Sequence, residues 1–296
     1  MSFLTETQWN DFTKNGYRII DGVASANEIT SLNARIDEIM SGTIQYPNLM
    51  MQLDPNAEGG KSTTSGGATG SGGVPLTDYH TSGTETVGQS AGFKGPSANY
   101  RKIGEAHGGL ELDPLFQSYM CQPLFREICA SVYGAHAGVS IYRAMVMAKP
   151  AGQDGGGTLL PWHQDGGDWW GLDRDPLCFI WLALTEATAA NGAVEVIPGS
   201  HHLGLLSKRG HTLSDTDIER YCPETAVKTV TLKAGQAFLA HNWLIHRSGI
   251  NTTTEPRRGF SANFVDSRTK VCEPRLPGAG LIGETGKAFP LLWERR

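Results

Sequence analysis

Two residues with metal-binding side chains stand two positions apart, at His163 and Asp165, within the segment PWHQD. In an extended strand, side chains alternate between the two faces, so this imidazole and this carboxylate point to the same side. A histidine and a carboxylate side by side form two-thirds of a facial metal triad. Because isolated His/Asp pairs more often make ordinary hydrogen bonds, the pair alone does not establish a metal site.

A third ligand has to come from elsewhere in the chain, and His246 fits because it stands near the end of a later strand-like segment. Three protein ligands on one face leave three positions open, as Fe(II) needs in order to hold a chelating cosubstrate and O2 together. Nitrogen and oxygen donors without thiolate suit Fe(II) but do not exclude Zn2+. His241 precedes His246 by five residues, so in a regular strand it faces the opposite side.

Two arginines, Arg257 and Arg258, follow His246 across a short turn, Arg257 at eleven residues. We expect the strands of His246 and Arg257 to be adjacent, which would place a guanidinium beside the metal. The planar donor fork of arginine pairs bidentately with a carboxylate, so it could anchor the far carboxylate of 2-oxoglutarate chelated to iron. Either arginine could serve, and the other would then be a solvated surface residue.

The elements that must position these residues are helices followed by short strands. Apolar residues recur at helical spacing in the first forty residues, where Ser25 is a candidate N-cap, and again over 113–133. Six strand-like segments follow, bounded by residues such as Asn191-Gly192: 139–148, 177–185, 193–197, 226–232, 237–246 and 259–266. This order indicates one mainly β (α+β) domain over 1–296, a β-sandwich or barrel with its helices packed on one face.

Residues 56–74 interrupt the domain with a Gly-, Ser- and Thr-rich stretch, expected to be a flexible insertion that is either a lid or disordered. The net charge is −5 without a run of Lys or Arg, which favours a small-molecule partner over nucleic acid or an anionic membrane. No secretory signal or apolar stretch of membrane-spanning length is visible, and five cysteines without CxxC spacing suit a reducing, cytoplasmic environment. The oligomeric state is not predicted.

Longer stretches of the chain resemble the phytanoyl-CoA dioxygenase (PhyH-like) family of Fe(II)/2-oxoglutarate-dependent oxygenases. The similar pieces are WHQD, NGAVEVIPGSHH, AGQAFLAHNWLIHRSGIN with the following RR, the N-terminal helix–strand–helix, and YRKIGEAHGGLELDPLF. The resemblance covers most of the chain apart from the Gly/Ser insertion and the C-terminal tail. It implies a double-stranded β-helix (a cupin-like jelly roll), with HxD on an early barrel strand and the distal histidine on a late one.

The resemblance also implies roles for individual residues. The iron ligands, and hence the catalytic centre, would be His163, Asp165 and His246. The cosubstrate, 2-oxoglutarate, would be bound by Arg257, with Ser248 supporting the same carboxylate. Further residues implied at the cosubstrate or substrate pocket are Gln164, Trp181 and Lys149.

These implications describe a dioxygenase that uses Fe(II), 2-oxoglutarate and O2 and releases succinate and CO2. Asp165 favours hydroxylation, because related iron halogenases have Ala or Gly at that position. Desaturation or ring closure at the same site stays open, as does a cupin-type metal hydrolase or isomerase. A catalytically silent binding module is disfavoured, because all three ligand positions are filled.

The expected substrate is a small-molecule metabolite or biosynthetic intermediate. The loop GGDWWGLDRDP follows the metal ligands and would lie at the mouth of the barrel. Its residues Trp169, Trp170 and Asp168 are the candidate substrate contacts. The alternative is that the tryptophans pack in the core and the acidic residues form a solvated rim.

Overall fold

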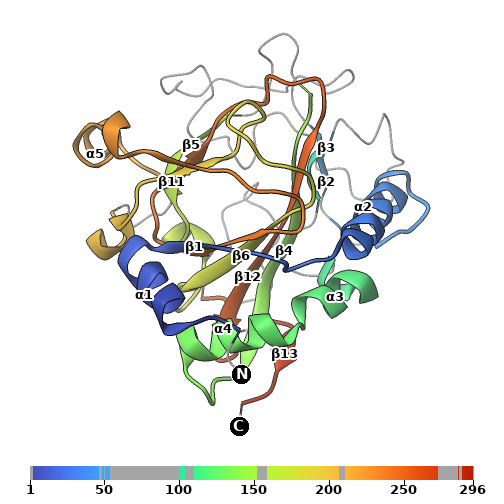
Figure 1. Cartoon of the computed structure of the whole chain (residues 1–296). Helices are drawn as coiled ribbons and strands as arrows, with labels where there is room; N and C mark the ends of the chain where they lie inside the picture. Colours follow the sequence, from blue (N-terminus) through green and yellow to red (C-terminus); the bar gives the residue numbers. More distant parts are fainter. Residues whose placement is uncertain are drawn as a thin grey trace.

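A computed structural model describes residues 3–46, 49, 51–53, 100–103, 110–151, 159–206, 211–272, 286 and 289–295. The insertion expected at 56–74 lies outside the described residues. Within them, strands form two antiparallel sheets and helices cover one side (Figure 1). The mainly β architecture predicted from the sequence is confirmed.

The larger sheet has the strand order β1-β10-β6-β12-β4-β3-β2, and β13 also pairs with β4. Its strands are β1 (Tyr17–Ile20), β2 (Met51–Leu53), β3 (Tyr100–Ile103), β4 (Val139–Lys149), β6 (Cys178–Ala183), β10 (Ala237–His241), β12 (Arg257–Asp266) and β13 (Leu291–Trp293). The longest pairing joins β4 to β12, which run antiparallel from Lys149 opposite Arg257 to Val139 opposite Asp266. This pairing forms the centre of the sheet on which the site is built.

The smaller sheet has the order β8-β5-β11-β7-β9. Its strands are β5 (Leu160–Gln164), β7 (Val194–Val196), β8 (His211–Thr212), β9 (Lys228–Val230) and β11 (His246–Ser248). Strands β4 to β7 alternate between the two sheets, as do strands β9 to β12. This alternation winds the chain into a double-stranded β-helix, the jelly roll that the resemblance implied.

Four helices cover the outer face of the larger sheet: α1 (Glu6–Asn15), α2 (Ala26–Met40), α3 (Pro114–Met120) and α4 (Pro123–Tyr133) (Figure 1). Ser25 caps α2 as predicted, since its side chain accepts from the backbone N–H of Glu28 and Glu28 accepts in return. Apolar residues of the helices pack against outward-facing side chains of the strands in one core. A fifth helix, α5 (Asp215–Tyr221), lies by the smaller sheet and was not predicted. None of the described helices is long and apolar enough to cross a membrane.

Two predicted elements are wrong in extent. The single helix expected over 113–133 is two helices, because Pro123 has no backbone N–H and cannot continue α3. The single strand expected over 237–246 is also two strands, β10 and β11, which belong to different sheets. A turn closed by the hydrogen bond from Leu244 N–H to the carbonyl oxygen of His241 separates them.

Side-chain alternation decides what faces the interior between the sheets. On β12, Phe260, Ala262 and Phe264 lie in the helix-covered core. The alternate residues of β12 therefore face the interior, where Phe179 and Trp181 of β6 form a cluster with residues of the smaller sheet.

Candidate metal centre

Three metal-binding side chains converge where the smaller sheet pairs β5 with β11. His163 of β5 lies directly opposite His246 of β11, and Asp165 follows the last residue of β5. One ligand atom from each residue lies within 4.8 Å of the other two. The ring centroids of the two histidines are 3.9 Å apart, and His163 Nε2 is 3.9 Å from Asp165 Oδ1. Of the described side chains, this is the one group that could hold a metal ion, and it is the predicted set.

Both histidines are fixed in the tautomer that a metal requires. Nδ1 of His163 donates to the carbonyl oxygen of Pro161, and Nδ1 of His246 donates to that of Leu244, each at 2.8 Å. A carbonyl oxygen only accepts, so Nδ1 carries a proton, and in the neutral ring Nε2 keeps a lone pair for a metal. Hydrogen bonds of this kind orient metal-binding histidines and raise their basicity. The two rings are 3% and 6% exposed, so the centre lies inside the barrel.

A hydrogen-bonded clamp holds the turn that follows Asp165. Asp175 accepts from the backbone N–H of Gly167 at 2.9 Å and from the indole N–H of Trp243 at 3.1 Å. Gly166 has φ +142°, and a Cβ there would lie 2.8 Å from Asp175 Oδ2, so the turn requires glycine. Because Trp243 lies shortly before the distal histidine, Asp175 joins the loops of two metal ligands. The sequence did not predict this clamp, since the indole partner is 68 residues away.

Gln164 differs from the expectation that it lines the cosubstrate or substrate pocket. Its Nε2 donates to the carbonyl oxygens of Gly204 at 2.8 Å and Trp243 at 2.7 Å. Its Oε1 accepts from the backbone N–H of Leu206 at 2.8 Å. The amide of Gln164 therefore connects two loops behind His163. It lies on the face of β5 that points away from the metal ligands.

The interior face of the larger sheet brings two cationic side chains together. Arg257 of β12 lies directly opposite Lys149 of β4, and the two are 3% and 5% exposed. The guanidinium of Arg257 lies over the indole ring of Trp181, with 5.1 Å between Cζ and the ring centroid. Gly259 makes room for that ring, because a Cβ at Gly259 would overlap it. Two adjacent buried cations attract an anion, and the arginine fork suits a carboxylate.

A turn at Gly192 connects these cations to β11. Arg257 Nη1 donates to the carbonyl oxygen of Gly192 at 2.7 Å. Gly192 has φ +77°, and a Cβ there would lie 2.8 Å from Lys149 Cδ and against the carbonyl oxygen of Gly249. Because Ser248 immediately precedes Gly249, Ser248, Lys149 and Arg257 gather around one turn. Gly192 therefore positions the pocket, whereas the sequence indicated only a strand boundary there.

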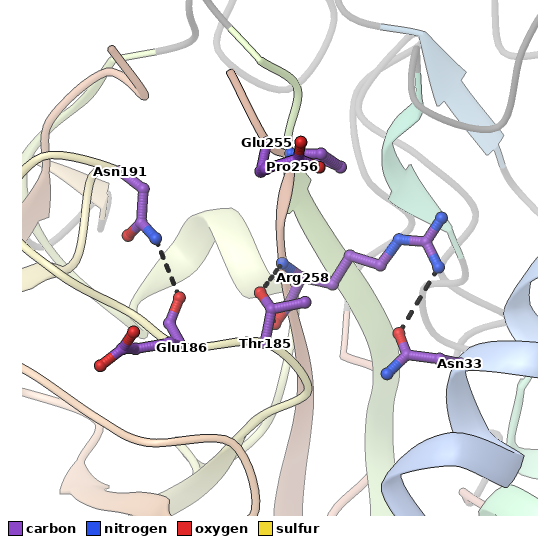
Figure 2. Close-up of a pocket in the computed structure, with 7 residues that line it drawn as sticks. All are labelled: Asn33, Thr185, Glu186, Asn191, Glu255, Pro256 and Arg258. Carbon is purple, nitrogen blue, oxygen red and sulfur yellow. Dashed lines mark hydrogen bonds between the residues drawn. The ribbon is translucent and has the colours of Figure 1, made fainter. Parts of the chain in front are cut away.

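Arg258 faces the other side of β12. Its guanidinium forms an ion pair with Asp37 of α2 at 2.8 Å and approaches Asn33 at 3.5 Å, while its backbone N–H donates to Thr185 Oγ1. Figure 2 shows its side chain extending towards α2. The polar pocket there has a volume of about 470 Å³ and is lined by Asn33, Thr185, Glu186, Asn191, Glu255, Pro256 and Arg258. Arg258 thus attaches α2 to the sheet, and Arg257 is the arginine directed to the interior.

The expectation that β11 and β12 are adjacent is wrong. The two strands belong to different sheets, and the chain crosses between the sheets over residues 249–256. Arg257 comes near the metal ligands through the interior instead. Its guanidinium covers Trp181, and Phe179, two residues earlier on β6, lies 5.8 Å from the ring of His246.

In the loop after Asp165, the alternative interpretation holds for Trp170, which packs in the core. Trp170 ends the short helix η4 (Asp168–Trp170), is 1% exposed, and packs on Tyr142 with 5.0 Å between ring centroids. It therefore lies in a buried cluster and does not cover the barrel mouth. Asp168 is exposed, and the side chain of Trp169 lies outside the part of the chain that the structure describes.

A second histidine cluster lies outside the metal centre. His201 is 3.9 Å from His202 and 5.1 Å from His241, measured between ring centroids. His241 Nδ1 accepts from the backbone N–H of Trp243 at 3.0 Å. Burial, and then the two neighbouring histidines, lower the pKa of His241 to about 4. His241 is not part of the metal-binding group, as the sequence predicted.

The residues present fit an iron ion and a chelating dicarboxylate. Two imidazoles and one carboxylate on one side are the ligand set that leaves Fe(II) open positions, and no thiolate belongs to the group. A jelly roll with this triad, and with a buried arginine in its interior, defines the class of non-haem iron, 2-oxoglutarate-dependent oxygenases.

Comparison with known proteins agrees with this class. The family model described as phytanoyl-CoA dioxygenase (PhyH) matches residues 12–259, so the chain belongs to that family. A relative named phytanoyl-CoA dioxygenase, from Arabidopsis thaliana, is 26% identical over 277 residues, which cover 89% of each chain. Family membership makes the chain an Fe(II)- and 2-oxoglutarate-dependent dioxygenase.

Solved structures show the same fold. EctD from S. alaskensis, determined with 2-oxoglutarate and 5-hydroxyectoine, has a TM-score of 0.65 at 17% identity, covering 100% of this chain and 88% of that chain. The epimerase SnoN, determined with Fe3+, alpha ketoglutarate and nogalamycin RO, has a TM-score of 0.63 at 18% identity, covering 97% of this chain and 98% of that chain.

Proposed function

We propose that this dioxygenase hydroxylates a small-molecule metabolite or biosynthetic intermediate, with iron held by His163, Asp165 and His246. The observation that carries the proposal is the convergence of these three ligands within 4.8 Å, beside an interior that also contains Arg257. When bound, Fe(II) chelated by 2-oxoglutarate activates O2 for C–H oxidation, and succinate and CO2 are the coproducts.

The chain's own residues bind and orient the two small molecules. The Nε2 atoms of His163 and His246 face the metal position because both Nδ1 atoms donate to backbone carbonyl oxygens. Arg257 would bind the far carboxylate of 2-oxoglutarate, with Lys149 adding a second positive charge and Ser248 a hydroxyl donor. The ring of Trp181 lies under the guanidinium and restricts the directions in which its fork can point.

Two features support hydroxylation of a small molecule. Asp165 fills the carboxylate position, which leaves no ligand site for the halide that a halogenase needs. The two metal-binding histidines are almost completely buried, so the reacting carbon has to enter the barrel interior. A compact metabolite can do so. Because the epimerase SnoN shares the fold, product analysis has to distinguish hydroxylation from other oxidative outcomes.

The test uses the whole protein with Fe(II), ascorbate and 2-oxoglutarate. Under anaerobic conditions, the weak visible charge-transfer band of the iron–keto-acid chelate should form, and admission of O2 should then produce succinate. Asp165→Ala and His246→Ala should lose both signals, because each removes one of three ligands. His202→Gln changes an exposed histidine outside the group and should keep both.

Persistence of the band and of succinate formation in both ligand variants would contradict the proposed site. If the wild type binds metal but forms neither band nor succinate, a cupin-type hydrolase or isomerase becomes the better assignment. Mass spectrometry of the substrate product completes the test: a gain of one oxygen indicates hydroxylation, and a loss of two hydrogens indicates desaturation or ring closure.

A further inference from the structure

A third buried cation lies on the interior face of β4, at a distance from the pair Lys149 and Arg257. Arg143 is directly opposite Asn263 of β12, and Asn263 is directly opposite Phe179 of β6. Directly opposed residues of antiparallel strands share a face. Arg143 and Asn263 therefore point into the interior at the level of Phe179, whose ring lies 5.8 Å from that of the metal ligand His246.

Arg143 is 4% exposed and is held by aromatic rings. Its Cζ lies 4.3 Å from the ring centroid of Trp170 and 5.0 Å from that of Tyr142. Aromatic rings attract the face of a guanidinium, whereas a carboxylate is bound by its edge, so the two kinds of contact are compatible. The rings hold the guanidinium on the interior face of the sheet.

Two further N–H donors near Arg143 lack an acceptor in the described part of the chain. They are Nδ2 of Asn263 and the indole Nε1 of Trp170. The two residues are 3% and 1% exposed, so bulk water does not satisfy these donors. Buried donors in folded proteins are almost always hydrogen-bonded. The two donors that lack an acceptor, Asn263 Nδ2 and Trp170 Nε1, lie beside the buried positive charge of Arg143. A group that is anionic and only accepts fits this combination, which describes a carboxylate.

We propose that Arg143, Asn263 and Trp170 form a subsite that binds a carboxylate of the substrate. The inference rests on the proposed function and names its substrate class, a small molecule that carries a carboxylate. The subsite is separate from the 2-oxoglutarate anchor, because Lys149 stands six positions after Arg143 on β4, about 20 Å along the strand. It holds the substrate at the level of the metal, while Arg257 and Lys149 hold the cosubstrate from the other end of the strand.

The experiment measures binding to the protein loaded anaerobically with Fe(II) and 2-oxoglutarate. Isothermal titration calorimetry uses three pairs of probes that differ in charge: acetate and acetamide, benzoate and benzamide, cyclohexanecarboxylate and cyclohexanecarboxamide. At least one carboxylate should bind ten-fold or more tightly than its amide. Arg143→Gln should reduce that ratio to near one while the visible band of the iron–keto-acid chelate remains. Arg258→Gln, on the same sheet but its outer face, should leave the ratio unchanged.

Other results overturn the subsite. These are equal binding of every carboxylate and its amide to the wild type, an Arg143→Gln variant that keeps the ratio, and carboxylate binding that abolishes the band, which would place the probe at the cosubstrate anchor. The band separates the two proposals. Its absence from the wild type counts against the iron and 2-oxoglutarate site, whereas an intact band without carboxylate preference counts against the subsite alone.

Two milder variants keep the test decisive if Arg143→Gln does not fold. Asn263→Leu is nearly isosteric and removes the amide donor, and Trp170→Phe keeps an aromatic face for Arg143 but removes the indole N–H. Each should weaken carboxylate binding about three- to ten-fold and leave amide binding unchanged. Unchanged carboxylate binding in both variants would show that neither donor binds the carboxylate and would overturn the subsite.

Discussion

Arg257 and Arg258 are neighbours in the chain but have opposite surroundings. Arg257 is buried over Trp181 and donates to Gly192, whereas Arg258 pairs with Asp37 on the outer side. We predict that Arg257→Gln raises the KM for 2-oxoglutarate about 10- to 100-fold, since a hydrogen-bonded charge contributes about 1.5–3 kcal/mol. Iron binding should be unchanged. Succinate formation at varied 2-oxoglutarate concentrations measures the first effect, and metal titration the second.

Arg258→Gln is the matched control for this prediction. It removes the same group from the adjacent residue and should leave the 2-oxoglutarate requirement as in the wild type. An unaltered KM in Arg257→Gln would transfer the anchoring role to Lys149, the other buried cation of the pair. Equal effects of both substitutions would indicate a general loss of structure.

The metal ligands could be predicted from the sequence, because the HxD spacing and strand alternation place two of them together. Other residues depend on contacts that the sequence does not show. Both arginines satisfied the same spacing, and the register of β12 was needed to separate them. Trp170 stands in a loop with acidic neighbours, as an exposed residue would, but packs on Tyr142, which precedes it by 28 residues.

At the scale of elements, the Asp175 clamp joins the turn after β5 to the turn before β11. We predict that Asp175→Asn weakens Fe(II) binding about 10- to 100-fold, the usual effect of losing a residue that orients metal ligands. The amide would replace one acceptor with a donor facing either Gly167 N–H or Trp243 Nε1. The metal dissociation constant provides the measurement, and circular dichroism monitors the fold.

Asp173→Asn serves as the control for the clamp. Asp173 lies in the same loop, and its Oδ1 accepts from the backbone N–H of Lys270, which belongs to neither turn of the clamp. It should bind Fe(II) as the wild type does. If Asp175→Asn also retains full affinity, the turn of Asp165 is held by other contacts, such as the hydrogen bond from its N–H to Asn242.

The order of helices and strands could be predicted because each apolar run is bounded by clear signals. The failures occur where such signals are weak. Residues 237–246 contain apolar runs on both sides of His241-Asn242-Trp243 without Gly or Pro, so nothing indicated that the strand divides between two sheets. The wrong expectation that the strands of His246 and Arg257 are adjacent has the same cause, because a crossing between two sheets looks like a hairpin in the sequence.

At the scale of the whole molecule, the second histidine cluster couples stability to pH. It lies where α1 meets the barrel, and His201 Nε2 donates to the carbonyl oxygen of Thr13. The pKa of His241 is about 4 in the folded protein, against 6.5 for an ordinary histidine. Between these values the unfolded chain binds a proton that the folded chain does not, so stability falls as the pH is lowered from 6.5 towards 4.

We therefore predict that His241→Gln reduces the loss of stability on acidification by roughly 1–2 kcal/mol, because solvent partly screens the charge of a histidine that is not fully buried. Urea unfolding at pH 7 and pH 4.5 measures the difference for each protein. His202→Gln, at an exposed position in the same cluster, should behave nearly as the wild type. An equal loss in wild type and His241→Gln would mean that other groups cause the acid sensitivity.

The contact between Gly259 and Trp181 has a consequence for how β12 finds its pairing during folding. With two arginines in succession, a one-residue slip that moves Arg258 to the place of Arg257 would still present a guanidinium to the interior, so charge alone cannot detect the error. That slip would, however, place Phe260 where the indole ring leaves room only for glycine. Gly259 therefore favours the correct register of β12 on steric grounds, whereas the two successive arginines do not distinguish the two registers.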